Sequence, residues 1–497
     1  MLILGLDVGT SGCKAIVFDD KWNIVDHSHR EYSLINVGEN KYDLEPETVW
    51  GKLQEAIIEI NDRTNKKIDA VAISALGDVI IPLDKTGNPV RPSIIDFDPR
   101  GKNEINDFIK GYGAENLYQI TGMPPIHINS LAKILWIKKN EPRSYKKVHR
   151  WATFEDYILQ KLGIKPTVSY SLAARTMLFD IHQKSWSQDI IDAAGLCESS
   201  LPVTVPSGKV IASLDSEVAK KLGFSSSAAA CSGGHDIVCA AIGAGLDVNN
   251  PHTALNIMGT MEAVIVLTKE AKIKKEMLKN LYPCYPAYKE YISLSLNLTS
   301  GSILNWYRNI FSGFYVGKSK GGIYGTLLQN IDCNNPGDLL LIPHFSGICN
   351  PTFNPDARGS LYGLSLNTTI DDLMQSIIEG LCYDLNLHIQ GFRDAGIQIN
   401  RLKIVGGGSQ SNNWLQLKAN ITGLEIVRPE LHEASAMGAA ALCGTAVGVV
   451  DDPYKVLSST GLKETRFFPS LKAVKQFKEK FSRYRKLNEE IGRFETN

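Results

Sequence analysis

The chain has 497 residues, of which 43% are hydrophobic and 21% are charged. This length exceeds what one hydrophobic core can organise and suits two or three domains of a globular protein. Lys and Arg together number 53, as do Asp and Glu, so the formal net charge is zero. The balance argues against a protein that binds nucleic acid or an anionic membrane surface.

The cysteines and the N-terminal residues indicate the cellular compartment in which the protein is expected. Nine cysteines are present and no two follow a C-x-x-C spacing, so we expect reduced thiols in the cytoplasm rather than disulfides or a zinc site. Residues 1–5 have no cationic region before their apolar run, and we expect no signal peptide. The longest apolar stretches, such as residues 237–246, are too short to cross a membrane.

The first elements predict an α/β fold. Residues 2–19, LILGLDVGTSGCKAIVFD, predict two strands joined by a Gly-Thr-Ser-Gly turn. A third strand is expected within residues 23–34. Apolar residues at helical spacing predict a helix over residues 45–62, and Pro46 suits its first turn. Residues 68–76 then predict a buried strand, so the sheet is expected to be mixed.

Residues 231–245, CSGGHDIVCAAIGAG, place two glycines before a His-Asp pair and a run of small residues. This pattern predicts a helix that begins near Asp236, where the helix dipole favours an ionised carboxylate. Gly233 and Gly234 indicate that another group approaches this backbone closely. A ligand is one such group, and the alternative is an Asp that only caps the helix.

The opening pattern recurs about half a chain later. Residues 253–267 repeat strand, Gly-Thr turn and strand when Gly259 and Thr260 are matched to Gly9 and Thr10. Residues 399–423 add a strand, three glycines and a helix, and correspond in position to residues 68–78. These matches predict two structurally similar halves.

The halves are expected to join at residues 246–252, a polar stretch that contains proline. The predicted domains are therefore residues 1–246 and 253–497. Residues 471–491 predict a terminal amphipathic helix with a solvated charged face.

Two glycine-containing turns are candidate phosphate sites. The first turn, at Gly9 and Thr10, offers backbone N–H and hydroxyl donors, and Asp7 before it could hold Mg²⁺. The alternative is a plain hairpin with a capping Asp, but the second copy favours two phosphate-binding turns that face a cleft. The segment VGGGSQSNNW suits an anionic ligand at a helix N-terminus, or a glycine-rich turn with Ser411 or Asn412 as N-cap.

Four stretches, in this order, resemble the FGGY family of carbohydrate kinases. They are GLDVGTSGCKAIVFD, GGHDIVCAAIGAG, PDARGSLYGLSLNTTIDDLMQSIIEGL and VGGGSQSNNWLQLKANITG. The resemblance extends over nearly the whole chain and implies two actin-like/RNase H-like ATPase domains with a nucleotide and sugar cleft between them. It further implies ATP and Mg²⁺ as cofactors and phosphorylation of a hydroxyl on a small-molecule sugar. A homodimer is an additional hypothesis.

The resemblance also assigns roles to residues. Asp236 is expected to be the general base that accepts the proton of the attacking hydroxyl, and Asp7 is expected to be the metal ligand. The expected nucleotide-binding residues are Thr10, Ser11, Lys14, Gly259, Thr260, Gly407, Gly408 and Asn412. The expected sugar-binding residues are Asp78, Asp98, Arg100, His235 and Asp236, with His127 and Asn129 as further candidates.

The sugar itself is not identified by the resemblance. Gly77 and Asp78 stand where glycerol kinases have Arg-Glu and xylulokinases Met-His, and Asp96 replaces the usual Trp, so a sugar-stacking face is lost. His235 either touches the sugar or only fills space. The leading hypothesis is a kinase for a ketose, such as a pentulose or a 6-deoxyhexulose, and the in-class alternative is a polyol or glycerol kinase.

Two other classes share this fold. An actin-like or Hsp70-like ATPase would keep the phosphate-binding turns but would not need the Gly-Gly-His-Asp sequence. A sugar-responsive repressor would need a DNA-binding segment, and we expect none, because the first core strand begins at Leu2.

Overall fold

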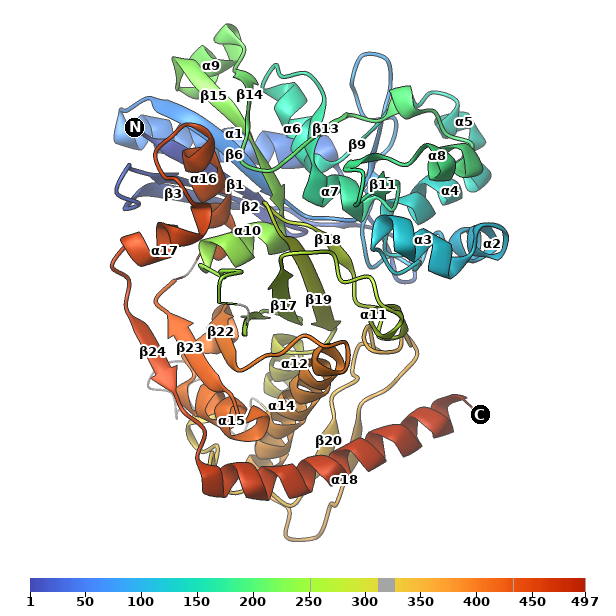
Figure 1. Cartoon of the computed structure of the whole chain (residues 1–497), viewed down its shortest axis with the longest axis vertical. Coiled ribbons are helices and arrows are strands. Elements are labelled where there is room, and N and C mark those ends of the chain that lie inside the picture. The colour runs from blue at the N-terminus through green and yellow to red at the C-terminus, as the bar shows by residue number, and fades with distance from the viewer. Residues whose placement is uncertain (251, 312–326, 432, 497) are drawn as a thin grey trace.

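Two large sheets, one in each half of the chain, organise the computed structural model, which describes residues 1–250, 252–311, 327–431 and 433–496 (Figure 1). The first sheet contains β1 (Ile3–Val8), β2 (Gly12–Phe18), β3 (Ile24–Glu31), β6 (Ile68–Ala75), β14 (Val210–Ser213) and β15 (Phe224–His235). The second contains β16 (Thr253–Met258), β17 (Glu262–Thr268), β18 (Cys284–Pro286), β19 (Tyr291–Asn297), β22 (Arg401–Val405), β23 (Glu425–Pro429) and β24 (Glu464–Phe467).

The strand order confirms the predicted internal repeat. The first sheet runs β3-β2-β1-β6-β15-β14, and the second runs β19-β17-β16-β22-β23-β24 with β18 added at one edge. In each half the opening hairpin is antiparallel, and its first strand pairs in parallel with the strand that follows later in that half, β6 or β22. The two Gly-Thr turns therefore lie at equivalent points of the two sheets, and both sheets are mixed as expected.

Helices and short strands complete each half. In the first half the helices are α1 (Pro46–Thr64), α2 (Lys102–Tyr112), α3 (Ala114–Thr121), α4 (Ser130–Asn140), α5 (Pro142–Tyr145), α6 (Phe154–Lys161), α7 (Tyr170–Arg175), α8 (Gln188–Ala194), α9 (Ser216–Leu222) and α10 (Asp236–Gly243). In the second half they are α11 (Lys275–Lys279), α12 (Gly301–Phe311), α14 (Ile370–Asp394), α15 (Asn412–Thr422), α16 (Ala434–Ala446), α17 (Val456–Ser459) and α18 (Leu471–Thr496). The short strands are β4 (Ile35–Gly38), β5 (Lys41–Leu44), β7 (Ile81–Leu83), β8 (Ser93–Ile94), β9 (Arg150–Ala152), β10 (Thr167–Ser169), β11 (Phe179–Asp180), β12 (Ser185–Trp186), β13 (Val203–Val205), β20 (Leu340–Ile342) and β21 (Ser360–Tyr362).

The predicted helices at residues 45–62 and 471–491 are present as α1 and α18, and α1 has its proline in the first turn. The hairpin of β4 and β5 was not predicted. All four residues of β4 are exposed, so the strand has none of the alternation between apolar and polar residues that identifies a half-buried strand.

Helix α16 belongs to the second half in sequence but packs on the first sheet. It contacts β1, β6 and β15 and lies along α10, as Figure 1 shows. A Cβ on Gly438 would overlap the carbonyl of Cys239, and one on Gly243 would overlap that of Ala434. The predicted boundary at residues 246–252, of which Pro251 lies outside the described residues, separates the two sheets. It does not separate the helices, because α16 packs on α10 and on the strands of the first sheet.

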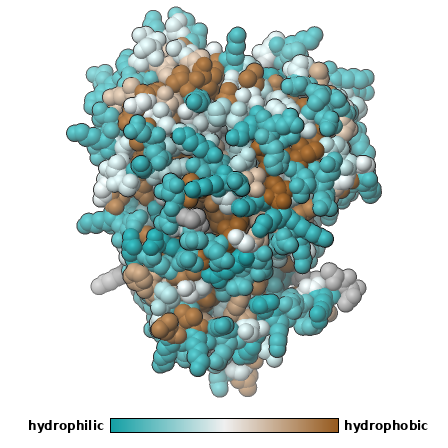
Figure 2. Space-filling model, in the orientation of Figure 1, coloured by the Kyte–Doolittle hydropathy of each residue, from teal (hydrophilic) through white to brown (hydrophobic). Residues whose placement is uncertain are grey.

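The surface on the face drawn in Figure 2 is mostly hydrophilic, with hydrophobic residues in small separate patches. In the part of the chain that the structure describes, no helix combines the length and the apolar character that a membrane span requires.

The crossing of α10 and α16 gives a stability prediction. Gly438→Ala should lower the free energy of unfolding by about 1–3 kcal/mol, because the new methyl group must displace the backbone of α10. Thermal unfolding measures the effect. The matched control is Gly111→Ala in α2, where a Cβ would meet nothing within 4 Å, and its Tm should not fall. An equal Tm for both variants would contradict the tight crossing.

Candidate active site

The Gly-Gly-His-Asp turn joins the end of β15 to the start of α10. The backbone N–H of Gly233 donates to Glu155 Oε1 at 2.9 Å, and a Cβ at this position would overlap the backbone of Ile73 on β6. A Cβ on Gly234 would lie 2.8 Å from Ser171 Oγ. Both glycines are therefore required by neighbouring protein. Protein, rather than a ligand, approaches them: the backbone of Ile73 at Gly233 and the side chain of Ser171 at Gly234. This corrects the interpretation of these glycines as ligand clearance.

Asp236 is the first residue of α10, and its two carboxylate oxygens differ in their surroundings. Oδ1 accepts a hydrogen bond from the backbone N–H of Ile237 at 2.7 Å and lies 3.1 Å from Nε2 of His235. Oδ2 accepts no hydrogen bond from any described residue. The side chain keeps 35% of its surface exposed, so it can be reached from the cleft although protein surrounds it.

Burial raises the pKa of Asp236 to about 7, and the nearby carboxylates of Asp7 and Asp96 add to the effect. The carboxylate thus gains and loses its proton near neutral pH, which suits a general base. One oxygen is held by the protein and the other is free to accept a proton from a ligand hydroxyl.

Asp78, expected to bind sugar, is engaged by the protein. It has a positive φ of 64°; its Oδ1 accepts from Asn129 Nδ2 at 2.9 Å, and its Oδ2 pairs with the guanidinium of Arg175. Asn129 Oδ1 and Asp96 Oδ1 are buried and accept no hydrogen bond from the described residues. Both oxygens therefore keep the acceptor capacity that Asp78 has already used.

Asp98 and Arg100 form a buried network of their own. Arg100 donates to both oxygens of Asp98, at 2.9 and 2.6 Å, and to Asp43 Oδ1 at 2.6 Å, and the backbone N–H of Tyr42 donates to Asp98 Oδ2. The guanidinium also lies 5.3 Å from the ring centroid of Trp136. The structure does not bring this pair to Asp236. It places the pair beneath the loop that carries Asp96.

Lys133, which the sequence did not single out, holds the same loop. Its buried Nζ donates to the carbonyls of Asp96, at 2.9 Å, and of His127 and Ile128. Burial lowers the pKa of this ammonium to about 8. His127 lies beside it, with its ring centroid 5.2 Å from that of Phe353 in the second half. The loop is thus fixed by backbone contacts that no local sequence pattern reveals.

The first Gly-Thr turn spans residues 9–12. The backbone N–H of Gly9 donates to Gly12 O at 2.9 Å, and the hydroxyl of Tyr32 donates to the carbonyls of both glycines. Those carbonyls are thereby occupied, which leaves Thr10 and Ser11 at the tip of the turn.

Two charged residues flank this turn on β1 and β2. Asp7 Oδ1 accepts from Ser74 Oγ at 2.8 Å, and burial raises the pKa of Asp7. Lys14 lies on β2 opposite Asp7, and its Nζ pairs with Glu433 Oε2 at 2.7 Å. The ammonium expected to bind nucleotide is thus already neutralised by a carboxylate from the segment that precedes α16.

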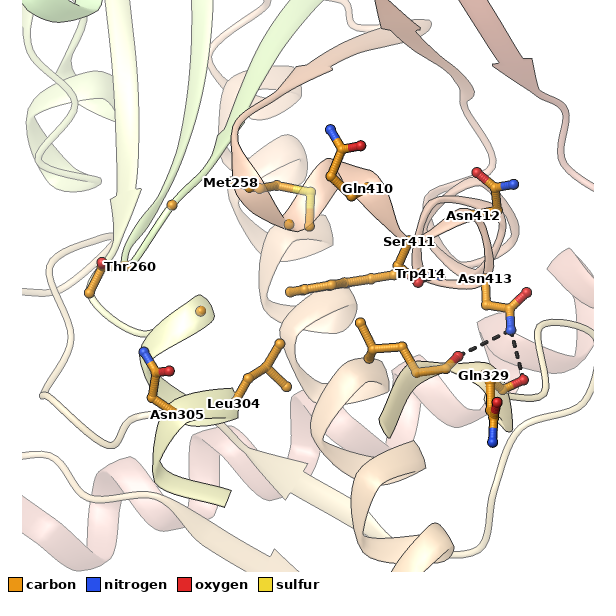
Figure 3. A pocket seen from close by; sticks show the side chains of 15 residues that line it. Met258, Thr260, Leu304, Asn305, Gln329, Gln410, Ser411, Asn412, Asn413 and Trp414 are labelled. Atoms are coloured by element: carbon orange, nitrogen blue, oxygen red, sulfur yellow. Dashed lines mark hydrogen bonds between the residues drawn. The ribbon is translucent and has the colours of Figure 1, made fainter. Parts of the chain in front are cut away.

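The second Gly-Thr turn borders a pocket of about 820 Å³, within the range of nucleotide-sized sites. Figure 3 shows Thr260 and Asn305 on one side of the pocket and Ser411, Asn412 and Asn413 on the other. Five expected nucleotide residues line it: Gly259, Thr260, Gly407, Gly408 and Asn412. The other three, Thr10, Ser11 and Lys14, lie outside this pocket on the first half.

The pocket wall is built by the N-terminus of α15. Ser411 is the N-cap, and its Oγ accepts from the backbone N–H of Trp414 at 3.3 Å. Asn412 is held by Arg428 Nη1 at 2.9 Å. A Cβ on Gly408 would lie 2.8 Å from Met258 Cε, whereas one on Gly407 would meet nothing within 4 Å. Gly407 therefore faces open space, and Gly408 is a packing position.

Residues that the sequence did not indicate also line the pocket. The apolar walls come from Met258, Leu304, Leu328 and Trp414, and Asn413 donates to the carbonyls of Leu328 and Gln329 (Figure 3). These side chains come from several separate elements, so no single motif contains them. The pocket combines apolar surface for a flat ring with a helix N-terminus suited to an anion.

Comparisons with known proteins agree with this arrangement. The model of the N-terminal domain of the FGGY family of carbohydrate kinases matches residues 2–243, and that of its C-terminal domain matches residues 254–447. The xylulose kinase of Staphylococcus xylosus is 27% identical over 446 residues, covering 88% of this chain and 89% of that protein. A glycerol kinase of Saccharolobus islandicus is 27% identical over 507 residues, covering 95% and 93%.

The fold is also shared with solved structures. The crystal structure of ligand-bound xylulose kinase from Lactobacillus acidophilus has a TM-score of 0.89 and 23% identity, covering 99% of this chain and 98% of that one. Because the two family models together match most of the chain, the assignment does not depend on any single motif. The chain belongs to the FGGY family of carbohydrate kinases.

Proposed function

We propose that this carbohydrate kinase transfers the γ-phosphate of ATP to a hydroxyl of a neutral ketose of the xylulose type, with a polyol as the alternative acceptor. The observation that carries the proposal is the geometry of Asp236. One of its oxygens is held by the protein, and the other is free at the end of β15, which β6 separates from β1 and the first phosphate-binding turn. The similarity to xylulose kinases supports a ketose.

In the proposed reaction, the oxygen of the sugar hydroxyl attacks the γ-phosphorus and ADP leaves. Oδ2 of Asp236 accepts the proton of that hydroxyl. Phosphoryl transfer requires positioning and charge neutralisation more than covalent chemistry. Asp96 and Asn129 would position the sugar through their unpartnered oxygens. The turns at Thr10 and Thr260 would offer N–H and hydroxyl groups to the phosphates from opposite sides of the cleft.

Asp7 fits a role in Mg²⁺ binding. Only Ser74 donates to its carboxylate among the described residues, and these residues include no group of three His, Cys, Asp or Glu side chains that could hold a metal ion. Mg²⁺ commonly takes one or two carboxylates, water and substrate phosphates, so a lone carboxylate beside a phosphate site is appropriate. The bound ion would neutralise phosphate charge during transfer.

The charge of the sugar region favours an uncharged substrate. Asp78, Asp96 and Asp236 interact electrostatically around it, and Arg175, its nearest guanidinium, is already paired with Asp78. A substrate carboxylate would meet three acids, while Arg175 is paired with Asp78 and the ammonium of Lys133 is already bound by three backbone carbonyls, so its entry carries an energetic cost in this partly buried site. A neutral ketose brings only hydroxyl donors, which match the acceptors present.

Compartment and assembly remain part of the proposal. All nine cysteines are free thiols, which supports a reducing compartment such as the cytoplasm. A homodimer stays a prediction, to be tested by light scattering on the purified chain.

The activity is tested with a panel of ketoses, polyols and gluconate in a coupled assay for ADP. We expect ADP release that depends on sugar, fastest with a ketose of the xylulose type and negligible with gluconate, because the acidic pocket repels its carboxylate. ATP turnover that is equally fast without any sugar would instead support an actin-like or Hsp70-like ATPase. Turnover of gluconate as fast as of the ketose would contradict the electrostatic argument.

Asp236→Asn tests the base. The amide cannot accept a proton, so kcat should fall by roughly 10²–10⁴ while sugar and ATP binding survive. In the wild type, kcat/KM should fall as the pH drops through about 7, since protonation of Asp236 removes the acceptor. For the residual activity of Asp236→Asn, kcat/KM should not show this fall at low pH. Asp107→Asn on the exposed face of α2 is the control. A variant with wild-type kcat would show that Asp236 is not the base.

Gly407→Val tests the nucleotide pocket. Its side chain would enter the open space of the pocket without striking the protein, so KM for ATP should rise at least about tenfold. KM for the sugar and Tm should stay near wild type. Gly408→Val provides the contrast, because it collides with Met258 and should lower Tm as well. Equal effects of Gly407→Val on both substrates would place the nucleotide elsewhere.

A further inference from the structure

His235 is enclosed between the proposed base and a tyrosine of the second half. Only 4% of its surface is exposed. Its Nε2 lies 3.1 Å from Asp236 Oδ1, and its Nδ1 lies 2.8 Å from the hydroxyl of Tyr285. The two rings are 5.7 Å apart between centroids. Both nitrogens of the imidazole therefore have protein partners, and neither is left for a sugar hydroxyl.

The chemistry of the partners fixes the protons. A carboxylate oxygen can only accept a hydrogen bond, so with Nε2 3.1 Å from Oδ1 the imidazole is more stable with its proton on Nε2, where it faces the carboxylate electrostatically. Burial and the charge of Arg175 lower the pKa of His235 well below its usual value, so the ring is neutral and Nδ1 has a lone pair. Burial raises the pKa of the Tyr285 phenol, which keeps its proton and donates it to Nδ1.

We propose that His235 is a positioning residue that orients the carboxylate of Asp236, and that Tyr285 holds His235 in the required tautomer. The proposal rests on the assignment of Asp236 as the base. His235 then neither binds the sugar nor merely fills space, the two roles that the sequence allowed. With Oδ1 held by the backbone N–H of Ile237 and faced by Nε2 of His235, Oδ2 is directed to the reacting hydroxyl.

Gly77 provides independent support for this arrangement. A Cβ at this position would lie 2.6 Å from Nε2 and 2.7 Å from Cδ2 of His235. The imidazole therefore occupies the space that a side chain at position 77 would need. The glycine in the expected sugar loop is explained by the residue beside the base, rather than by the sugar.

Tyr285 is fixed from both halves of the molecule. It lies on β18, the edge strand of the second sheet. The guanidinium of Arg175, on α7 of the first half, lies 5.3 Å from its ring centroid. The preceding residue, Cys284, donates its backbone N–H to Gly122 O at 2.8 Å, and Tyr118 donates to Tyr282 O at 2.8 Å. The orientation of the base therefore depends on how the second half is seated against the first.

Tyr285→Phe removes the hydroxyl but keeps the ring over which Arg175 lies. With D-xylulose, or the sugar of the panel that turns over fastest, kcat should fall about 10- to 100-fold, the range for losing a group that orients another functional side chain. KM for sugar and for ATP should stay within about twofold. Tyr307→Phe is the matched control, because it loses a hydrogen bond to the carbonyl of Ile370 within the second half, away from Asp236, and should keep wild-type kcat. Equal kcat for both variants overturns the proposal.

Replacement of His235 separates positioning from packing. The side-chain amide of His235→Gln can donate to Asp236 as Nε2 does, so this variant should recover most of the kcat that His235→Ala loses. Similar losses in both variants would indicate packing alone and overturn the proposal, as would wild-type activity in His235→Ala.

A readout without turnover distinguishes this proposal from the proposed function. In protein with ¹⁵N-labelled histidine, NMR should show His235 as the neutral Nε2–H tautomer at about pH 8–9, where Asp236 is ionised, and a mixture of tautomers in Tyr285→Phe. The signal is assigned by its absence from His235→Gln. If no sugar of the panel turns over, the proposed function fails while this spectrum still decides the role of Tyr285. An Nδ1–H tautomer, or titration near 6.5, overturns the inference.

Discussion

The near contact between the backbones of α10 and α16 is the constraint on which the site depends. Gly438 and Gly243 leave no room for a Cβ between the two helices, and the same helix α16 lies against Gly5 of β1. Because α10 begins with Asp236 and β1 carries Asp7, α16 fixes the distance between the proposed base and the proposed metal ligand. A helix from the second half thus builds the chemistry of the first, and the domain boundary in the sequence is not a boundary in the packing.

The site gathers carboxylates that would repel one another in an ordinary interior. Burial raises the pKa values of Asp7, Asp96 and Asp236, and for Asp96 and Asp236 neighbouring acids add to the rise. Such clustering lowers stability and persists where ligands supply the missing positive charge and hydrogen-bond donors. The other buried acids have protein partners: Asp78 pairs with Arg175, and Asp98 with Arg100. Glu155 is also buried without a cationic partner, but it accepts backbone N–H groups from Ser169 and Gly233. Asp7, Asp96 and Asp236, the acids proposed for the reaction, have neither an ion-pair partner of this kind nor two backbone donors on both oxygens among the described residues.

Patterns in short stretches of the sequence predicted those features that neighbouring residues encode. Alternating strands, turn glycines and the repeated Gly-Thr hairpin predicted two similar halves with mixed sheets, since each pattern is encoded within about twenty residues. Asp236 was found for the same reason. Tyr285, Arg175 and Lys133 were missed, because their functional contacts lie 50 or 97 residues away or are made to backbone carbonyls. The glycines before His235 were misinterpreted because a close strand and a close ligand favour the same residue.

Gly77 and His235 show that the shape of the sugar pocket and the orientation of the base are not independent. The loop after β6 can carry a side chain at position 77 only if the imidazole at position 235 moves or is replaced. An imidazole at 235 is useful only if a donor such as Tyr285 fixes its tautomer. A larger residue introduced at 77 to alter sugar choice would therefore disturb the surroundings of Asp236, the proposed base. Sugar specificity in this chain is then constrained by base positioning, and the pocket must discriminate through Asp96 and Asn129, which do not touch the imidazole.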